Sequence, residues 1–212
     1  MAQQVHQGPG GGAKQGQQPT TGTSSDANAT PFLTDVATLR QRARQHIDEG
    51  AVTSSYELPT EQVVKVLNDA LATELVCVLR YKRHYFMAEG IHSESVKSEF
   101  LEHANEEQAH ADRLAERIVQ LGGEPDFSPE GLASRSHSQY VEGQNLREMI
   151  VEDLVAERIA IDSYREIAQW LGTRDSTTRK MMEEILASEE EHADDLVSLL
   201  AGMPKEPGSG ND

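Results

Sequence analysis

The stretch that decides the fold is residues 122–144, GGEPDFSPEGLASRSHSQYVEGQ, in a chain of 212 residues. It is rich in Gly, Pro and Ser, the residues that interrupt regular structure, and it separates two long helical segments. A link of this length can run along a whole helix bundle, whereas a short link makes its two helices antiparallel neighbours. The stretch therefore limits how the helices on its two sides can be arranged.

Long helical patterns with stop signals lie on both sides of this link. We predict helices over residues 60–89 and 93–121 before it, and over 145–171 and 175–201 after it. Each is long enough for a rod of roughly 40 Å, and a short link joins the two members of each pair. No alternating strand pattern lies between them. Two hairpins joined by a crossover form the ferritin-like arrangement, so we predict an all-α, ferritin-like four-helix bundle with one long crossover between its second and third helices.

The remaining chain divides around this bundle, which we place at residues 59–202. Residues 1–30 are mainly Gln, Gly, Pro, Thr and Ser, and this composition predicts a disordered tail. Residues 31–58 are predicted to hold a linker and a short N-terminal amphipathic helix over 34–49, which would pack on the bundle or on a neighbouring subunit. Residues 203–212 are predicted to be a flexible tail, too short for a fifth helix of any length.

Composition and charge argue against several kinds of partner. The net charge of −17, from 19 basic and 36 acidic residues, makes DNA or anionic lipid an unexpected partner, because phosphate binding depends on basic side chains. The N-terminal tail adds only Lys14 and is too poor in lysine to bind DNA. No apolar run approaches the roughly 18 residues of a membrane span, and no signal-peptide pattern is present. A single cysteine, Cys77, indicates a reducing, cytoplasmic setting.

The spacing Glu-x-x-His, which an acidic chain can produce by accident, occurs three times: Glu89/His92, Glu107/His110 and Glu189/His192. The first pair spans Gly90 at a helix end, and we interpret it as accidental. The other two lie at the middle of the second and fourth predicted helices. Each follows a lone glutamate at the middle of the preceding helix, Glu74 or Glu157, and a tyrosine lies two turns after that glutamate, Tyr81 or Tyr164. The two hairpins therefore read as an internal duplication.

These charged side chains share helix faces with apolar residues, so they are predicted to face the core. Burying four carboxylates together is costly, and their mutual repulsion would keep some of them protonated. Two divalent cations would neutralise four carboxylates, and two neutral imidazoles would complete the ligand shells. Oxygen-rich ligation with one histidine per metal suits iron or manganese better than structural zinc. The alternative, ion pairs on the surface of acidic helices, suits a single Glu-x-x-His better than a duplicated set.

The constellation resembles the ferroxidase centre of the bacterioferritin family in six residues, in order and nearly in spacing: Glu74, Glu107, His110, Glu157, Glu189 and His192. The phrases TELV, HADRL and DLVAE are also similar, and the resemblance covers residues 60–200. It implies that Glu74 and His110 are terminal ligands of one iron. It places Glu157 and His192 on the other iron, with the remaining two glutamates as bridges. It also implies a supporting role for Tyr81, with Tyr164 as a symmetric companion of unassigned role.

Two departures from that family carry information. Gln108 stands directly after the first bridging glutamate, where bacterioferritins have a haem-ligating methionine, so haem is not expected here. Bacterioferritins also have a short fifth helix, which is not predicted here, and in this respect the chain is similar to the subunits of the smaller, twelve-subunit Dps-type cages. The chain is therefore similar to the Dps-like (mini-ferritin) branch with a bacterioferritin-type centre inside each subunit. Some members of that branch have a cysteine pair near the site, whereas Cys77 stands alone and is expected to pack as a small apolar residue.

We therefore predict a ferroxidase that stores and detoxifies iron. It would oxidise Fe²⁺ with O₂ or H₂O₂ at two irons per subunit, inside a hollow homo-oligomer of twelve or twenty-four subunits. Other acidic residues, among them Glu102, Glu106 and Asp112, are interpreted as solvated surface that could also guide iron. Two alternatives remain open: a di-metal peroxidase or manganese catalase, and a non-enzymatic Dps-type protective or scaffold protein.

Overall fold

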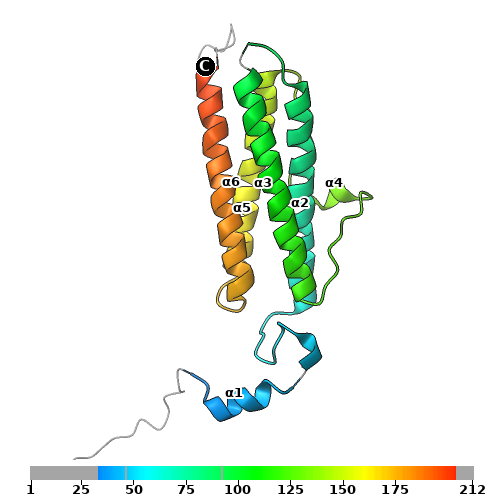
Figure 1. The fold of residues 1–212 in the computed structure, drawn as a ribbon, viewed down its shortest axis with the longest axis vertical. Helices are drawn as coiled ribbons and strands as arrows, with labels where there is room; N and C mark the ends of the chain where they lie inside the picture. The colour runs from blue at the N-terminus through cyan, green and yellow to red at the C-terminus, as the bar shows by residue number, and fades with distance from the viewer. Residues whose placement is uncertain (1–32, 46, 92, 204–212) are drawn as a thin grey trace, which may run out of the picture.

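The computed structural model describes residues 33–45, 47–91 and 93–203, and all regular structure in these ranges is helical (Figure 1). The all-α prediction is confirmed. The tail predicted at residues 1–30, nearly all of the tail predicted at 203–212, and one member of the pair Glu89/His92 lie outside the described residues. No helix within the described ranges is both long enough and apolar enough to cross a membrane.

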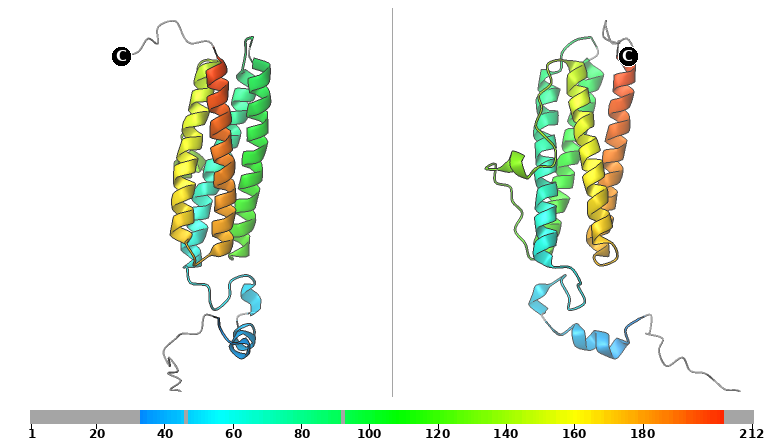
Figure 2. Two further views of the ribbon diagram at one scale, coloured as in Figure 1. Left: turned by 90° about the vertical axis from the view of Figure 1, so that its left-hand side faces the viewer. Right: turned by 180° about the vertical axis from the view of Figure 1, so that it is seen from behind.

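Four long helices form the body of the molecule: α2 (Thr60–Met87), α3 (Ser93–Gln120), α5 (Leu146–Leu171) and α6 (Ser176–Gly202). Their bounds lie within about two residues of the predicted ones, which is the usual uncertainty of a helix end. α2 pairs with α3 and α5 pairs with α6, and the two antiparallel hairpins lie side by side (Figures 1 and 2). Asn145 and Asp175 cap the starts of α5 and α6, because each side chain accepts a hydrogen bond from a backbone N–H three residues on.

The link between α3 and α5 runs along the outside of the bundle from one end to the other (Figure 2). As a result, α3 and α5 point in the same direction, and the predicted crossover is confirmed. The link carries one helical turn that the sequence did not predict, α4 (Leu132–Arg135). The link is held on α2 by hydrogen bonds, for example from the backbone N–H of His137 to Thr73 Oγ1 at 2.9 Å.

The N-terminal region is less regular than predicted. A single helix was expected over residues 34–49, but the structure has a short helix, α1 (Val36–Arg42), and then a 3₁₀ turn, η1 (Ile47–Glu49). None of the residues of α1 is buried, and α1 lies beyond the end of the bundle (Figures 1 and 2). A helix this short is marginal without packing, which explains its early end. In this structure α1 therefore does not pack on the bundle of its own chain, and packing on a neighbouring subunit stays a prediction.

The hydrophobic core consists of two clusters, one towards each end of the bundle. Leu71, Leu114 and Ile185 belong to the first, and Phe100 and Ile150 belong to the second. Between these apolar layers lies a group of buried carboxylates and imidazoles. Since apolar packing closes both sides, this polar group is held at the middle of four rigid helices.

Candidate metal centre

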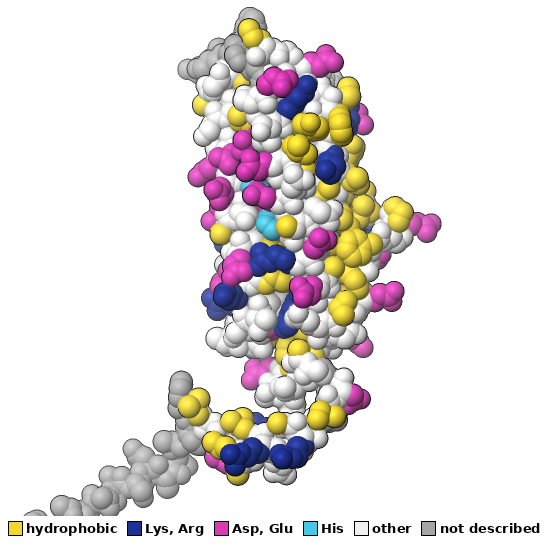
Figure 3. All heavy atoms as spheres, in the orientation of Figure 1, with side chains coloured by type: hydrophobic (Ala, Val, Ile, Leu, Met, Phe, Trp, Pro, Cys, Tyr) yellow, Lys and Arg dark blue, Asp and Glu magenta, His cyan; other side chains and the backbone are white. Residues whose placement is uncertain are grey.

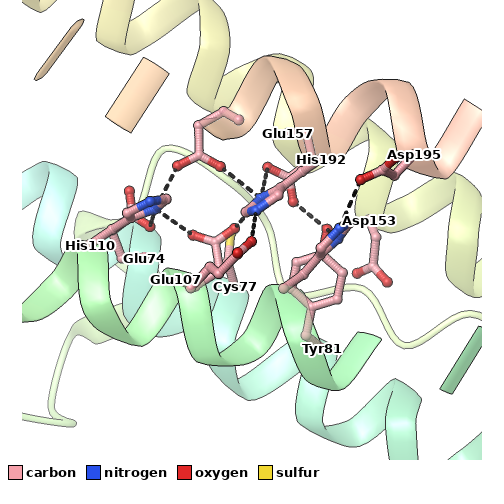
Figure 4. Close-up of polar contacts among 12 residues, drawn as sticks. Glu74, Cys77, Tyr81, Glu107, His110, Asp153, Glu157, His192 and Asp195 are labelled. Carbon is pink, nitrogen blue, oxygen red and sulfur yellow. Dashed lines mark hydrogen bonds and ion pairs between the residues drawn. The ribbon is translucent and has the colours of Figure 1, made fainter. Parts of the chain in front are cut away.

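Six side chains meet at this level of the bundle, and they are the six predicted from the sequence: Glu74 from α2, Glu107 and His110 from α3, Glu157 from α5, and Glu189 and His192 from α6. All six are buried, and the most accessible, His110, is 5% exposed. Figure 4 shows five of them converging from opposite sides of the bundle. Each helix contributes from its middle, where the backbone is least able to fray.

The six residues form two overlapping groups of potential metal ligands. One group contains Glu74 and His110, and the other contains Glu157 and His192; Glu107 and Glu189 belong to both. Within each group the potential ligand atoms all lie within 4.8 Å of one another. The arrangement therefore has the form of two adjacent sites that share two carboxylates.

Both histidines turn Nδ1 towards the carboxylates. His110 Nδ1 lies 3.0 Å from Glu189 Oε1, 3.5 Å from Glu74 Oε2 and 3.8 Å from Glu107 Oε2. The Nδ1 atom of His192 stands in the same relation to the carboxylates of its own group, at 3.3 to 3.9 Å. The duplication seen in the sequence is thus reproduced in three dimensions.

Seven buried atoms of this cluster make no hydrogen bond among the described residues and meet one another only in the ion-pair contacts given above: Glu74 Oε2, Glu107 Oε1, His110 Nδ1, Glu157 Oε2, Glu189 Oε1 and Oε2, and His192 Nδ1. A buried ion pair repays the cost of removing its charges from water only when further hydrogen bonds satisfy the remaining lone pairs, and these atoms make none, so folding alone gives little reason to gather them. Carboxylate oxygen and imidazole nitrogen are suitable ligands for iron and manganese. The donor set therefore fits two divalent cations.

The electrostatics of the cluster favour added positive charge. Burial and the neighbouring carboxylates Glu107 and Glu189 raise the pKa of Glu74 and of Glu157. Burial alone would lower the pKa of His110 and His192, but the surrounding carboxylates outweigh it and raise the pKa of each to about 12. Protons are therefore drawn to this site, and divalent cations would compete with them for the same lone pairs.

The two tyrosines hold the two lone glutamates, but not in the way the sequence suggested. Tyr81 donates a hydrogen bond to Glu157 Oε1, and Tyr164 donates one to Glu74 Oε1. Each tyrosine thus binds the glutamate of the opposite hairpin rather than the one on its own helix. In both glutamates the second oxygen, Oε2, is the atom left without a partner. Each tyrosine therefore orients its carboxylate so that one oxygen faces the cluster, which gives Tyr164 the role the sequence left unassigned.

Glu106 was interpreted as solvated surface, and the structure shows that it is exposed but also contacts a residue of the cluster. Its Oε2 lies 2.6 Å from His192 Nε2, although its side chain is about half exposed, at 49%. Such a contact fixes the orientation of a metal-binding imidazole and makes it a better ligand. The sequence offered no signal for this role, because Glu106 is one of many glutamates on α3 and its partner lies on α6.

A separate buried ionic cluster lies beside the six residues. Arg80 Nε donates to Asp153 Oδ1 at 2.7 Å, and His84 Nδ1 is 2.8 Å from Asp153 Oδ2. Asp153 is therefore neutralised by an arginine and needs no metal ion. Cys77 is buried, with Sγ 3.5 Å from an Arg80 nitrogen and 3.7 Å from Ser138 Oγ, and burial raises the pKa of its thiol. The expected packing role of Cys77 agrees with this position.

The position at which a haem ligand was considered lies on the surface. Gln108 is exposed and donates a hydrogen bond to Asp112 Oδ1 at 3.0 Å. The glutamine side chain lacks the thioether sulfur through which a methionine would bind haem iron. The expectation that haem is not bound rests on this substitution and stays a prediction.

Known proteins are similar to this chain in sequence and in fold. A sequence model of the Ferritin family, described as Ferritin-like domain, matches residues 64–205. The chain is 33% identical over 172 residues to the nutrient stress-induced DNA-binding protein of Nostoc sp., covering 80% of this chain and 92% of that protein. It is 34% identical over 147 residues to the bacterioferritin of Brucella melitensis, covering 68% of this chain and 86% of the relative.

A solved structure shares both fold and sequence. It is the dodecameric thioferritin of Bacteroides fragilis, a bacterioferritin-related protein, with a TM-score of 0.66 and 33% identity. The match covers 68% of this chain and 87% of that chain.

Proposed function

The chain belongs to the ferritin-like domain family, and from that premise we propose that it is a ferroxidase that stores and detoxifies iron. One observation supports this above all: seven ligand atoms of six buried residues, none of them used in a hydrogen bond, converge on two adjacent positions. A bundle stabilised only by packing would fill this space with apolar side chains, as it does in the layers on both sides. The cluster is instead suited to binding pairs of cations.

In this proposal Fe²⁺ is the substrate, and the six residues are its ligands. Glu74 and His110 would hold one ion, and Glu157 would hold the other together with His192. The two shared glutamates would bridge them. Four carboxylates balance two Fe²⁺ ions, so the site becomes neutral and the cost of burying its charges is largely removed.

Oxidation changes this balance. Two Fe²⁺ ions supply two electrons, which with two protons reduce one H₂O₂ to two H₂O, or one O₂ to H₂O₂. Two Fe³⁺ ions then leave a net charge of +2 against the same four carboxylates. This excess positive charge favours uptake of hydroxide by the site and transfer of the ferric ions to a mineral. Tyr81 and Tyr164 keep the two terminal carboxylates in place throughout.

The test is the rate of ferric absorbance after metal-free protein is mixed with Fe²⁺ and oxidant. We expect the wild type to exceed the rate in buffer, and the double variant Glu107→Gln/Glu189→Gln to fall to that rate, since both bridges lose their charge. Glu116→Gln, which removes an exposed carboxylate near the C-terminal end of the same helix, is the matched control and should keep the wild-type rate. If the double variant keeps its shell and oxidises Fe²⁺ as fast as the wild type, the ferroxidase proposal fails.

We propose that the chain assembles into a hollow homo-oligomeric shell. The dodecameric assembly of the Bacteroides fragilis relative supports this proposal. The mass of the particle in solution tests it, and a mass near twelve or twenty-four chains is the expected result. A dimer would instead favour the alternative of a di-metal peroxidase or a manganese catalase, and vigorous O₂ release from H₂O₂ by the manganese-loaded protein would identify the catalase.

DNA binding is a second candidate because the Nostoc relative is named a DNA-binding protein. The net charge of −17 argues against it in this chain, because contacts with phosphate depend on basic side chains. We predict no shift of duplex DNA in a gel at low salt; a shift would support a protective role of the Dps type.

The cytoplasm remains the proposed location, on the basis of the single cysteine.

A further inference from the structure

A third group of potential metal ligands lies outside the six-residue cluster. It consists of Glu99 and His103 of α3 and Asp195 of α6, one helical turn further along the bundle. His103 Nε2 lies 3.3 Å from Glu99 Oε1 and 3.8 Å from Asp195 Oδ2, and the three ligand atoms all lie within 4.8 Å of one another. Figure 4 shows Asp195 at one end of the drawn residues, well apart from His110 at the other end.

The imidazole of His103 is held rigidly. The residue is 1% exposed, and its ring stacks on that of His192 with centroids 4.1 Å apart and packs edge-on against Tyr81. His103 Nδ1 lies 3.2 Å from the hydroxyl oxygen of Tyr81. Packing from several sides therefore fixes which nitrogen faces Glu99 and Asp195.

The hydrogen bonds also determine the tautomer. The hydroxyl hydrogen of Tyr81 is used in its bond to Glu157, so towards His103 the hydroxyl oxygen can act only as an acceptor. His103 Nδ1 must then carry the hydrogen, and a neutral ring keeps its lone pair on Nε2. This is the tautomer that an Nε2 metal ligand requires, and the Nδ1–H hydrogen bond that fixes it is typical of metal-binding histidines.

Three acceptor atoms thus face one small space: a fixed imidazole lone pair and one oxygen from each of two carboxylates. Burial and the adjacent Asp195 raise the pKa of Glu99, because two carboxylates in contact repel each other. A divalent cation at this position would bind all three atoms and remove the repulsion.

Ions can reach this group from solvent. The side chains of Glu99 and Asp195 are 28% and 47% exposed, and His103 forms the buried wall behind them. Acidic side chains gather on this face of α3 and α6, with histidine visible among them (Figure 3). Exposed neighbours such as Glu102 and Glu106 add to a negative potential that concentrates cations.

We propose that Glu99, His103 and Asp195 form a separate binding site for one divalent cation of the Fe²⁺ or Mn²⁺ class. Two carboxylates and one imidazole match the preference of these ions, and the open solvent side leaves room for water ligands. The site does not depend on the proposed ferroxidase function, because it shares no ligand with the six-residue cluster.

Mn²⁺ is the probe for the test, since it binds such ligands without being oxidised by air at neutral pH. In crystals of the full chain soaked in Mn²⁺, we expect an anomalous peak among the three residues. By equilibrium titration the wild type should bind three Mn²⁺ ions per chain, and Glu99→Gln/Asp195→Asn should bind two. Glu116→Gln, which removes an exposed carboxylate near the C-terminal end of α3, is the control and should bind three.

The two kinds of site can be tested separately. Glu107→Gln/Glu189→Gln should lose the ions of the six-residue cluster and keep the peak at Glu99, His103 and Asp195. Peaks at the six-residue cluster with none at these three residues would overturn this inference and leave the proposed ferroxidase intact. An unchanged number of bound ions in Glu99→Gln/Asp195→Asn would overturn it as well.

Discussion

Metal binding at the six-residue cluster should stabilise the fold by an amount that can be worked out from its two overlapping sites. A ligand that binds only the folded chain stabilises it by about 2.7 kcal/mol when its free concentration is one hundred times its dissociation constant. Two such sites give about 5.4 kcal/mol if their contributions add. For a chain of this size, one kcal/mol raises the unfolding temperature by about 2–4 °C, so saturating Mn²⁺ should raise it by about 10–20 °C.

The assay is thermal unfolding followed by calorimetry, at pH 7 and at one fixed protein concentration, because assembly makes the transition depend on concentration. Measuring in the Glu99→Gln/Asp195→Asn background removes any contribution from the third site. In that background, adding Glu107→Gln/Glu189→Gln should abolish the metal-dependent rise, since each substitution removes a carboxylate that both sites share. An equal rise with and without the two glutamine substitutions would refute the reasoning, as would no rise in the parent protein.

Three further perturbations test the supporting contacts. Tyr81→Phe should cost about 1–3 kcal/mol of stability by leaving one buried carboxylate oxygen unsatisfied, and should weaken Mn²⁺ binding in a titration; unchanged binding would argue against an orienting role. Glu106→Gln should reduce Mn²⁺ affinity about 10–100-fold without unfolding the chain, and an unchanged affinity would show that its contact with His192 is incidental. Asp175→Ala should cost about 3–5 kcal/mol in chemical denaturation, because it removes the cap of α6 and leaves Arg117 buried without its carboxylate. Burial raises the pKa of Asp175, but its hydrogen bonds outweigh burial and lower the pKa from 3.8. The stabilisation that Asp175 provides is therefore present above pH 3.8 and is lost as the pH falls through the lowered pKa. If the wild type stays more stable than Asp175→Ala in stronger acid, this assignment is wrong.

The fold could be predicted because its evidence is distributed along the chain. Four long periodic segments ended by glycine, and one link too long for a hairpin, leave few arrangements. The N-terminal helix was predicted too long because periodicity alone does not stabilise a helix, and α1 has no core to pack against. The turn at α4 is too short to leave a periodic pattern.

The six candidate ligands could be predicted because the same pattern, a lone glutamate followed by Glu-x-x-His, occurs in both hairpins, which an accidental spacing would not explain. The supporting residues were not, because their roles depend on contacts between helices. Tyr164 lies on the same helix as Glu157 yet binds Glu74, and Glu106 acts on a histidine of α6. The tautomer of His103 depends on which atom receives the hydrogen of Tyr81, and only side-chain positions can show this.

The location of bound iron can be measured in crystals loaded with Fe²⁺ in the absence of oxidant, by anomalous scattering at the iron edge. We predict two peaks at the middle of the bundle, one beside Glu74 and His110 and the other beside Glu157 and His192, with the two shared glutamates within reach of both. A single ion at this level would contradict the arrangement of two adjacent sites that share two carboxylates, and so would iron bound only elsewhere in the molecule.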